Sequence, residues 1–129
     1  MSSITYLNNY INIIKIGLQN NLMYVFVPKT KLLIKITHLL YNLGYLNGYT
    51  LTQNKLKLFF KIVNSQYALS EITLISKPSN KVYLKKKYIK KLINTNLFFI
   101  CSSSMGSKIM TETELIMFNT GGKILLSVK

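Results

Sequence analysis

The chain has 129 residues, of which 49% are hydrophobic, so it can bury a core and is not a wholly disordered tail. Its 17 basic residues stand against only 3 acidic ones, which gives a net charge of +14. Self-repulsion of this size disfavours a compact fold unless a polyanion neutralises it. Nucleic acid is the leading explanation, and an anionic membrane surface is the second.

A helix and a strand are predicted at the start of the chain. Apolar residues recur at three and four positions over residues 4–18, which is the period of one helix face. The β-rich run over residues 22–27 stops at Pro28, where a strand should end. The predicted helix face consists of Ile4, Leu7, Tyr10, Ile11, Ile14 and Leu18.

A second helix is predicted over residues 31–42. Thr30 provides its N-cap and Gly44 ends it. His38 lies on or beside its apolar stripe without a second histidine or a carboxylate nearby, so we interpret it as a packed or surface imidazole rather than a catalytic one. The inward residues are expected to be Leu32, Leu33, Ile36, Leu39 and Leu40.

A β-hairpin is predicted from residues 45–51 and 56–63, with a turn at Gln53-Asn54. Leu56, Leu58, Phe60 and Ile62 alternate with Lys55, Lys57, Phe59 and Lys61, so one face is expected to be buried and the other largely cationic. The polar residues 64–66 are the best candidate boundary. The predicted domains are therefore an N-terminal α/β domain, 1–66, and a C-terminal β-rich RNA-binding domain, 67–129.

The middle of the chain predicts strands and a basic segment. Residues 72–76 and the return strand 81–84 flank a turn at residues 77–80. Residues 85–93 are expected to form a short basic helix or turn. Tyr83 and Tyr88 lie next to its lysines, and their rings could stack on a ribose or base. Core burial is the alternative for these tyrosines, and a solvated surface is the alternative for the lysines.

The last third predicts a strand, a loop of hydroxyls, a short helix, a double glycine and a final strand. Residues 97–101 are expected to form the buried strand, and residues 102–108 the loop. Thr111 and Glu114 have the spacing of a capping box. Hydroxyl and N–H groups in the loop can donate to phosphate oxygens, although a plain solvent-facing loop is the alternative.

The chain offers little for catalysis. Its carboxylates are Glu71, Glu112 and Glu114, and two of these belong to a helix start. No acid/base pair, metal spacing, phosphate loop or dinucleotide motif is present, so we expect no enzyme activity, no cofactor and no small-molecule substrate. Cys101 lies in an apolar run and is interpreted as a small core residue, with a reactive thiol as the alternative.

The residue usage points to a strongly AT-biased genome. Every basic residue is lysine, and the chain is rich in Asn, Ile, Leu and Tyr. Phosphates must then be met by point charges and hydroxyls rather than by guanidinium forks. No apolar stretch reaches the roughly 18 residues of a membrane span, and no presequence is evident. We therefore expect a mitochondrial, organelle-encoded protein without membrane insertion; a plastid or an AT-rich bacterium is the alternative.

Four motifs in order resemble the universal small-subunit ribosomal protein S-eight family in its bacterial and organellar form. They are Ile75-Ser76-Lys77-Pro78 with Lys81-Val82-Tyr83, then Ser102-Ser103-Ser104-x-Gly106, Ile109-Met110-Thr111-Glu112, and Gly121-Gly122-Lys123-Ile124. The resemblance covers essentially the whole chain. It departs where Ser103 stands for the family's threonine, and where Ser107-Lys108 looks like a two-residue insertion.

The resemblance implies a two-domain α/β (α+β) protein that binds the central domain of small-subunit rRNA, supports subunit assembly and adjoins other small-subunit ribosomal proteins. The N-terminal domain would run helix-strand-helix-strand-strand, and the C-terminal domain would be a mixed sheet with short helices. A non-ribosomal basic nucleic-acid-binding or peripheral membrane module is the alternative. With the basic residues nearby, the expected RNA-binding set is Ser102, Ser103, Ser104, Gly106, Lys108, Lys77, Pro78, Lys81, Tyr83, Lys85, Lys86, Lys87, Lys29, Thr30, Lys31 and Lys123.

Overall fold

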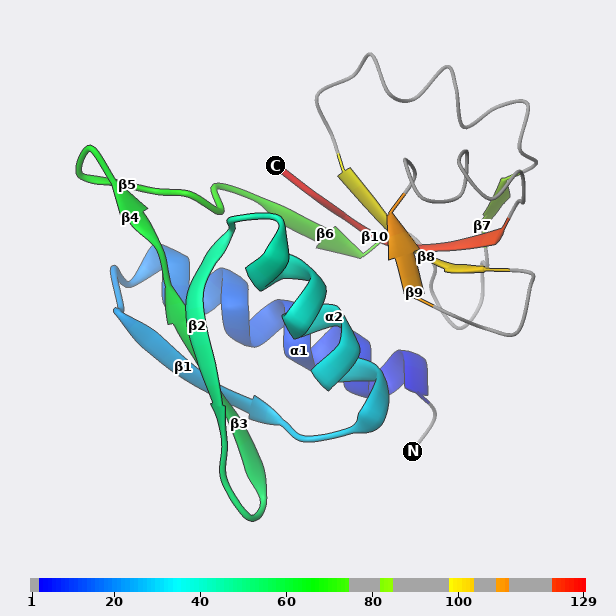
Figure 1. Ribbon diagram of the computed structural model, residues 1–129, viewed down its shortest axis with the longest axis horizontal. Coiled ribbons are helices and arrows are strands. Elements are labelled where there is room, and N and C mark those ends of the chain that lie inside the picture. The colour runs from blue at the N-terminus through cyan, green and yellow to red at the C-terminus, as the bar shows by residue number, and fades with distance from the viewer. Residues whose placement is uncertain (1–2, 75–81, 85–97, 104–108, 112–121) are drawn as a thin grey trace. The chain divides into compact units, whose positions relative to one another are not determined.

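A computed structural model describes residues 3–74, 82–84, 98–103, 109–111 and 122–129 (Figure 1). The chain divides into two compact units, residues 1–72 and 73–129. Helices and small antiparallel sheets occur together among the described residues, which confirms the predicted α+β fold class. The assignment of RNA binding to a C-terminal domain stays a prediction.

The first unit follows the predicted order of helix, strand, helix, strand and strand. Its antiparallel sheet has the order β1-β3-β2, and both helices lie on one face of it (Figure 1). A two-stranded ribbon of β4 and β5 follows. The elements are α1 (Ser3–Gln19), β1 (Tyr24–Pro28), α2 (Lys31–Asn42), β2 (Leu46–Leu51), β3 (Lys55–Phe60), β4 (Ile62–Val63) and β5 (Gln66–Tyr67).

The apolar face of α1 forms the centre of this unit. Leu7, Tyr10, Ile11 and Ile14 are fully buried, as their spacing predicts. Gly17 allows the helix to approach the sheet, because a Cβ atom there would lie 2.6 Å from Val25 Cγ1. Such a contact is shorter than van der Waals packing permits, so any larger residue would push α1 away from β1.

Helix α2 begins and ends at the predicted residues. The Thr30 hydroxyl oxygen accepts a hydrogen bond from the Leu33 N–H at 3.2 Å, which satisfies one donor of the first turn. Gly44 has a φ of +88°, and the Tyr45 N–H then donates to the Leu40 carbonyl. This left-handed glycine is the usual helix stop.

The hairpin of β2 and β3 confirms the predicted alternation except at Ile62. Leu56, Leu58 and Phe60 are buried, whereas Ile62 is 53% exposed. Strand β1 starts at Tyr24, opposite Phe59, so it offers no partner for a longer β3. The chain instead enters the β4–β5 ribbon, where Ile62 pairs with Tyr67. Ile62 therefore does not continue the buried face of β3.

The predicted boundary segment, residues 64–66, contains the turn of the β4–β5 ribbon. Asn64 and Ser65 have φ values of +52° and +63°, the conformation of a tight hairpin turn. Asparagine tolerates this region better than most residues, which explains the polar sequence there. The two compact units divide later, after Ile72.

Strand β10 organises the sheet of the second unit. The strand order is β6-β10-β8-β9, and β7 also pairs with β10. Strands β7 and β8 both pair antiparallel with residues 122–124, so they must lie on opposite edges of β10. The elements are β6 (Ile72–Leu74), β7 (Val82–Leu84), β8 (Phe98–Ser103), β9 (Ile109–Thr111) and β10 (Gly122–Val128).

The pairing of one strand in this sheet differs from the sequence-based prediction. The return strand, β7, pairs with β10, although a hairpin with residues 72–76 was expected. The register of β8 on β10 shifts between Ile124 and Leu126, which indicates a bulge. The basic segment 85–93 and the short helix predicted after Thr111 lie outside the described residues.

One buried hydrogen bond joins the two helices of the first unit. The hydroxyls of Tyr10 and Thr37 are 2.9 Å apart, and both residues are fully buried. Burial raises the pKa of the Tyr10 phenol, and the Thr37 hydrogen bond lowers it only in part, so the hydroxyl stays protonated. The pair therefore acts as a neutral link inside an apolar core.

We expect Tyr10→Phe and Thr37→Val each to lower the free energy of unfolding by about 1–3 kcal/mol, because each leaves one buried hydroxyl without its partner. The double variant should cost much less than the sum of the two, since no orphan hydroxyl remains. Urea unfolding of the four proteins measures this coupling. Additive losses would show that the hydroxyls do not depend on each other.

Candidate nucleic-acid interface

The start of α2 carries three of the expected RNA-binding residues. The Lys29 ammonium donates to the Thr52 carbonyl at 2.9 Å, so this side chain is tied to the β2–β3 turn. Thr30 caps the helix, and Lys31 is exposed at its first position. N–H groups and the helix dipole favour an anion at such an end. The local geometry is therefore suited to a phosphate.

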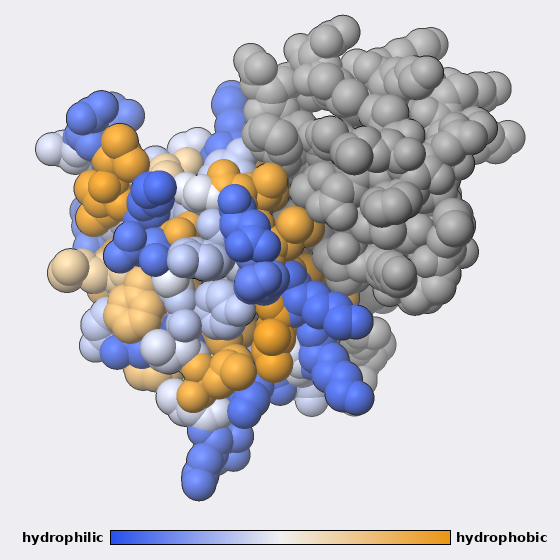
Figure 2. Space-filling view, in the orientation of Figure 1, coloured by the Kyte–Doolittle hydropathy of each residue, from blue (hydrophilic) through white to orange (hydrophobic). Residues whose placement is uncertain are grey.

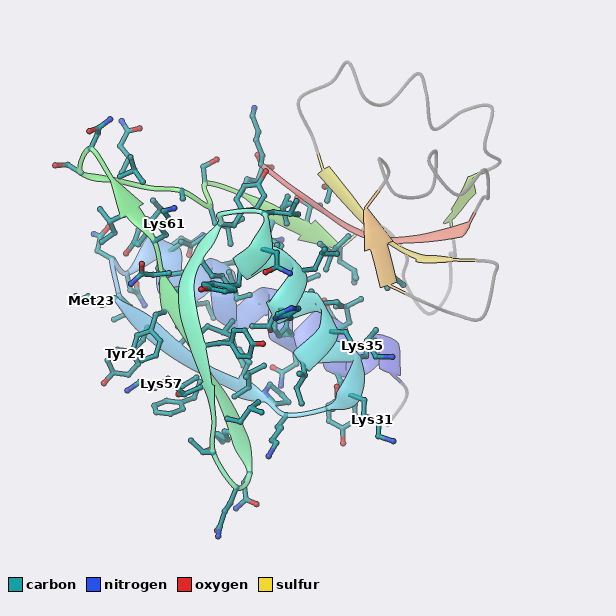
Figure 3. All side chains as sticks on the ribbon, viewed as in Figure 1. Met23, Tyr24, Lys31, Lys35, Lys57 and Lys61 are labelled. Atoms are coloured by element: carbon teal, nitrogen blue, oxygen red, sulfur yellow. The ribbon has the colours of Figure 1, made fainter. Side chains whose placement is uncertain are left out.

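The charge around this helix start is one-sided. Lys35 follows Lys31 by one turn, and both side chains are exposed and extend from α2 (Figure 3). The first unit contains seven lysines and a single carboxylate, Glu71. No acidic residue occupies the first turn of α2. A lysine at this end of a helix opposes the dipole, so its presence costs stability unless an anion binds.

The sheet of the second unit brings three other expected residues into one row. Lys123 of β10 pairs with Tyr83 of β7 on one edge and with Ser102 of β8 on the other. The next row contains Leu84, Gly122 and Ser103. Neighbouring Cα atoms in such rows lie about 5 Å apart. Three residue types that contact RNA, a hydroxyl, a cation and an aromatic ring, thus come from distant parts of the sequence.

The structure corrects the predicted position of two serines. Ser102 and Ser103 were expected in a loop, but both belong to β8 and pair with β10. Strand β9 also pairs with Ser102, through Ile109, so this serine lies between two neighbouring strands. Pairing on both edges outweighs the weak turn preference of serine. The two serines consequently belong to a sheet rather than to a loop.

The remaining expected contacts lie outside the described residues. Their placement stays a prediction. These residues are Lys77, Pro78, Lys81, Lys85, Lys86, Lys87, Ser104, Gly106 and Lys108.

The described residues were compared with the requirements of a metal site and of a membrane span. Within those ranges, no three His, Cys, Asp or Glu side chains come close enough to hold a metal ion. His38 is exposed, which agrees with its interpretation as a surface imidazole. Its Nδ1 is 2.8 Å from the Tyr49 hydroxyl. No described helix has the length and apolar character needed to cross a bilayer.

An aromatic cluster on the first unit was not predicted as a site. Tyr24 and Phe26 of β1 lie beside Lys57 and Phe59 of β3. Figure 3 shows Tyr24 and Lys57 on the sheet face opposite the helices. The alternation of β3 indicated a cationic outer face, but the register with β1 is not visible in sequence. Only that register shows which rings surround the lysine.

Comparison with known proteins identifies the family. The family model described as Ribosomal protein S8 matches residues 6–128. The small ribosomal subunit protein uS8m of Acanthamoeba castellanii is 35% identical over 125 residues, covering 95% of this chain and 97% of the relative. The uS8 protein of Chlorobaculum tepidum is 31% identical and covers 79% of each chain, and that of Caulobacter vibrioides is 29% identical and covers 95% of each. The chain therefore belongs to the ribosomal protein S8 family.

Proposed function

We propose that this chain is a structural component of the small ribosomal subunit that binds the central domain of the small-subunit rRNA and supports its assembly. Its role is to hold RNA in place rather than to catalyse a reaction. Family membership supports the ribosomal role, and the net charge of +14 supports a polyanionic partner. Its further partners are neighbouring proteins of the same subunit.

The row of Tyr83, Lys123 and Ser102 carries the proposal. A lysine neutralises a phosphate, a serine hydroxyl donates to phosphate or to a 2′-hydroxyl, and a tyrosine ring stacks on a base or ribose. A single stretch of RNA offers a partner for each of these three residues. Each residue also occurs in one of the sequence motifs that carry the resemblance.

The start of α2 provides a second contact with phosphate. Lys29 is held by the Thr52 carbonyl, so little side-chain freedom is lost when RNA binds near it. The N–H groups of the first turn and Lys31 complete the site. The expected residues outside the described ranges, from Lys77 to Lys108, belong to the proposed surface by resemblance alone.

We also propose a mitochondrial location. One relative carries the name uS8m, whose suffix marks a mitochondrial protein, and the lysine-only usage of basic residues fits an AT-rich organelle genome. Synthesis inside the organelle is part of the same proposal. A plastid location would show as association with plastid ribosomes in fractionated cells.

We expect Ser102→Ala to weaken binding of the full-length protein to a central-domain rRNA fragment by about five- to tenfold, because one hydroxyl contact is lost. The charge is unchanged, so the slope of log K against log salt should stay the same. Lys123→Ala should weaken binding and also reduce that slope by about one unit. Filter binding in a salt series measures both quantities.

Lys15→Ala is the matched control for Lys123→Ala, since Lys15 is an exposed lysine of α1 outside both proposed contacts. It should change the affinity for the fragment less than Lys123→Ala does. If Ser102→Ala and Lys123→Ala bind like the unaltered protein, the strand row is not the RNA contact.

Lys31→Glu should change stability and RNA binding in opposite directions. A glutamate at the first position of α2 complements the helix dipole and should raise the free energy of unfolding by about 0.3–1 kcal/mol. The same charge reversal should weaken binding to the rRNA fragment at low salt, because a phosphate would meet a carboxylate. Urea unfolding and filter binding on one protein preparation measure the two effects. Unchanged RNA affinity together with higher stability would remove α2 from the interface.

A further inference from the structure

The outer face of the first unit's sheet carries a compact group of rings around one cation. The β1–β3 register places Tyr24 opposite Phe59 and Phe26 opposite Lys57. We name these four residues the ring cluster. Tyr24 and Phe26 are 46% and 44% exposed, while Lys57 and Phe59 are half-buried. Large aromatic surface left in water on a sheet face indicates an interaction site.

The lysine is held by the rings themselves. Lys57 Nζ lies 4.1 Å from the centroid of the Tyr24 ring, 5.0 Å from that of Phe59 and 5.6 Å from that of Phe26. All three distances are within the range of cation–π attraction. Tyr24 and Phe26 meet edge to face, with centroids 5.8 Å apart. The three rings and the ammonium are thus gathered at one place on the sheet.

More positive charge borders the cluster. Lys55 follows the same alternation of β3 as Lys57 and Phe59, and residues two apart on a strand are about 6.8 Å from each other. Lys61 follows directly after β3, and Figure 3 shows it on the side of the unit that also carries Lys57. No carboxylate belongs to this row of residues. Apolar and hydrophilic side chains are accordingly interleaved on the surface of this unit (Figure 2).

We propose that the ring cluster binds unpaired RNA, with bases stacked on Tyr24 and Phe26 and the backbone phosphates paired with Lys57 and its lysine neighbours. Non-specific single-strand sites combine these two elements, aromatic platforms and a positive track. Every base has a flat π-face, so the site would accept many sequences. The ring cluster shares no residue with the strand row or with the start of α2.

The charge pattern favours RNA over a protein partner. An apolar protein surface would bury the Lys57 ammonium without a counter-charge, which is costly. Each nucleotide instead brings an anion together with a flat base. A base on Tyr24 would displace Lys57 from the ring, and the freed ammonium would then reach the adjacent phosphate. An acidic protein segment is the competing occupant, and the crosslinking experiment below distinguishes it from RNA.

The first test uses the full-length protein and a fluorescent oligouridine of about twelve nucleotides, a length within the range of known single-strand sites. Tyr24→Ala should weaken binding about tenfold, since stacking on one ring is lost. Tyr24→Leu should weaken it similarly, because leucine keeps apolar area but has no π-face. Fluorescence anisotropy gives the dissociation constants.

Tyr41→Ala is the matched control. Tyr41 is 45% exposed on α2, and it has no part in the ring cluster. This variant should bind oligouridine within about twofold of the unaltered protein. Equal effects of Tyr24→Ala and Tyr41→Ala, or full binding by Tyr24→Leu, would overturn the proposal. Oligouridine lacks the fold of the rRNA, so binding of oligouridine does not test the proposed rRNA contact. That contact is tested separately, by Ser102→Ala and Lys123→Ala.

Crosslinking locates the bound strand directly. A 4-thiouridine placed in the oligouridine should react, on long-wavelength irradiation, with the tryptic fragment 16–29, which contains Tyr24 and Phe26, or with fragment 58–61, which contains Phe59. Adducts confined to other fragments would contradict the assignment. In intact small subunits, a carbodiimide crosslink from Lys57 to a protein carboxylate would show an acidic protein partner there and would also overturn it.

Discussion

The shortage of carboxylates constrains the whole molecule. With 17 lysines and 3 glutamates, almost no lysine can be neutralised within the chain, so lysines must stay in contact with water or with an external anion. The described part of the first unit follows this rule. Its core is apolar except for the neutral Tyr10–Thr37 link. Apart from Lys15 on α1, its lysines lie near the start of α2 and along or just after β3. Folding and the proposed RNA binding therefore both require the lysines to lie on the surface of the molecule.

Strand pairing determines which residues lie next to the lysines of the proposed contacts. Strand β10 has neighbours on both edges, so its residues 122–124 bring together segments that are far apart in sequence. A cation at Lys123 would repel other lysines in the row, and the neighbouring positions are instead Tyr83 and Ser102. In the first unit, rings rather than acids hold Lys57, which leaves its charge available to a phosphate.

The helices of the first unit could be predicted from the local sequence pattern, since the helix period, the Thr30 cap and the Gly44 stop are short-range signals. Long-range pairing could not. Ser102 and Ser103 read as loop residues because their strand character comes from β10, and Ile62 read as buried because the alternation does not show where β1 begins. The ring cluster was missed for the same reason, as the neighbours of Lys57 depend on register.

The most direct test of the ribosomal assignment is sedimentation of a mitochondrial lysate through sucrose gradients at moderate and then high salt, followed by detection of this protein. We expect the protein to move with the small subunit and to stay there through the high-salt wash, because hydroxyl and stacking contacts persist when charge pairs are screened. Protein at the top of the gradient at both salt concentrations, or with the membranes, would contradict it.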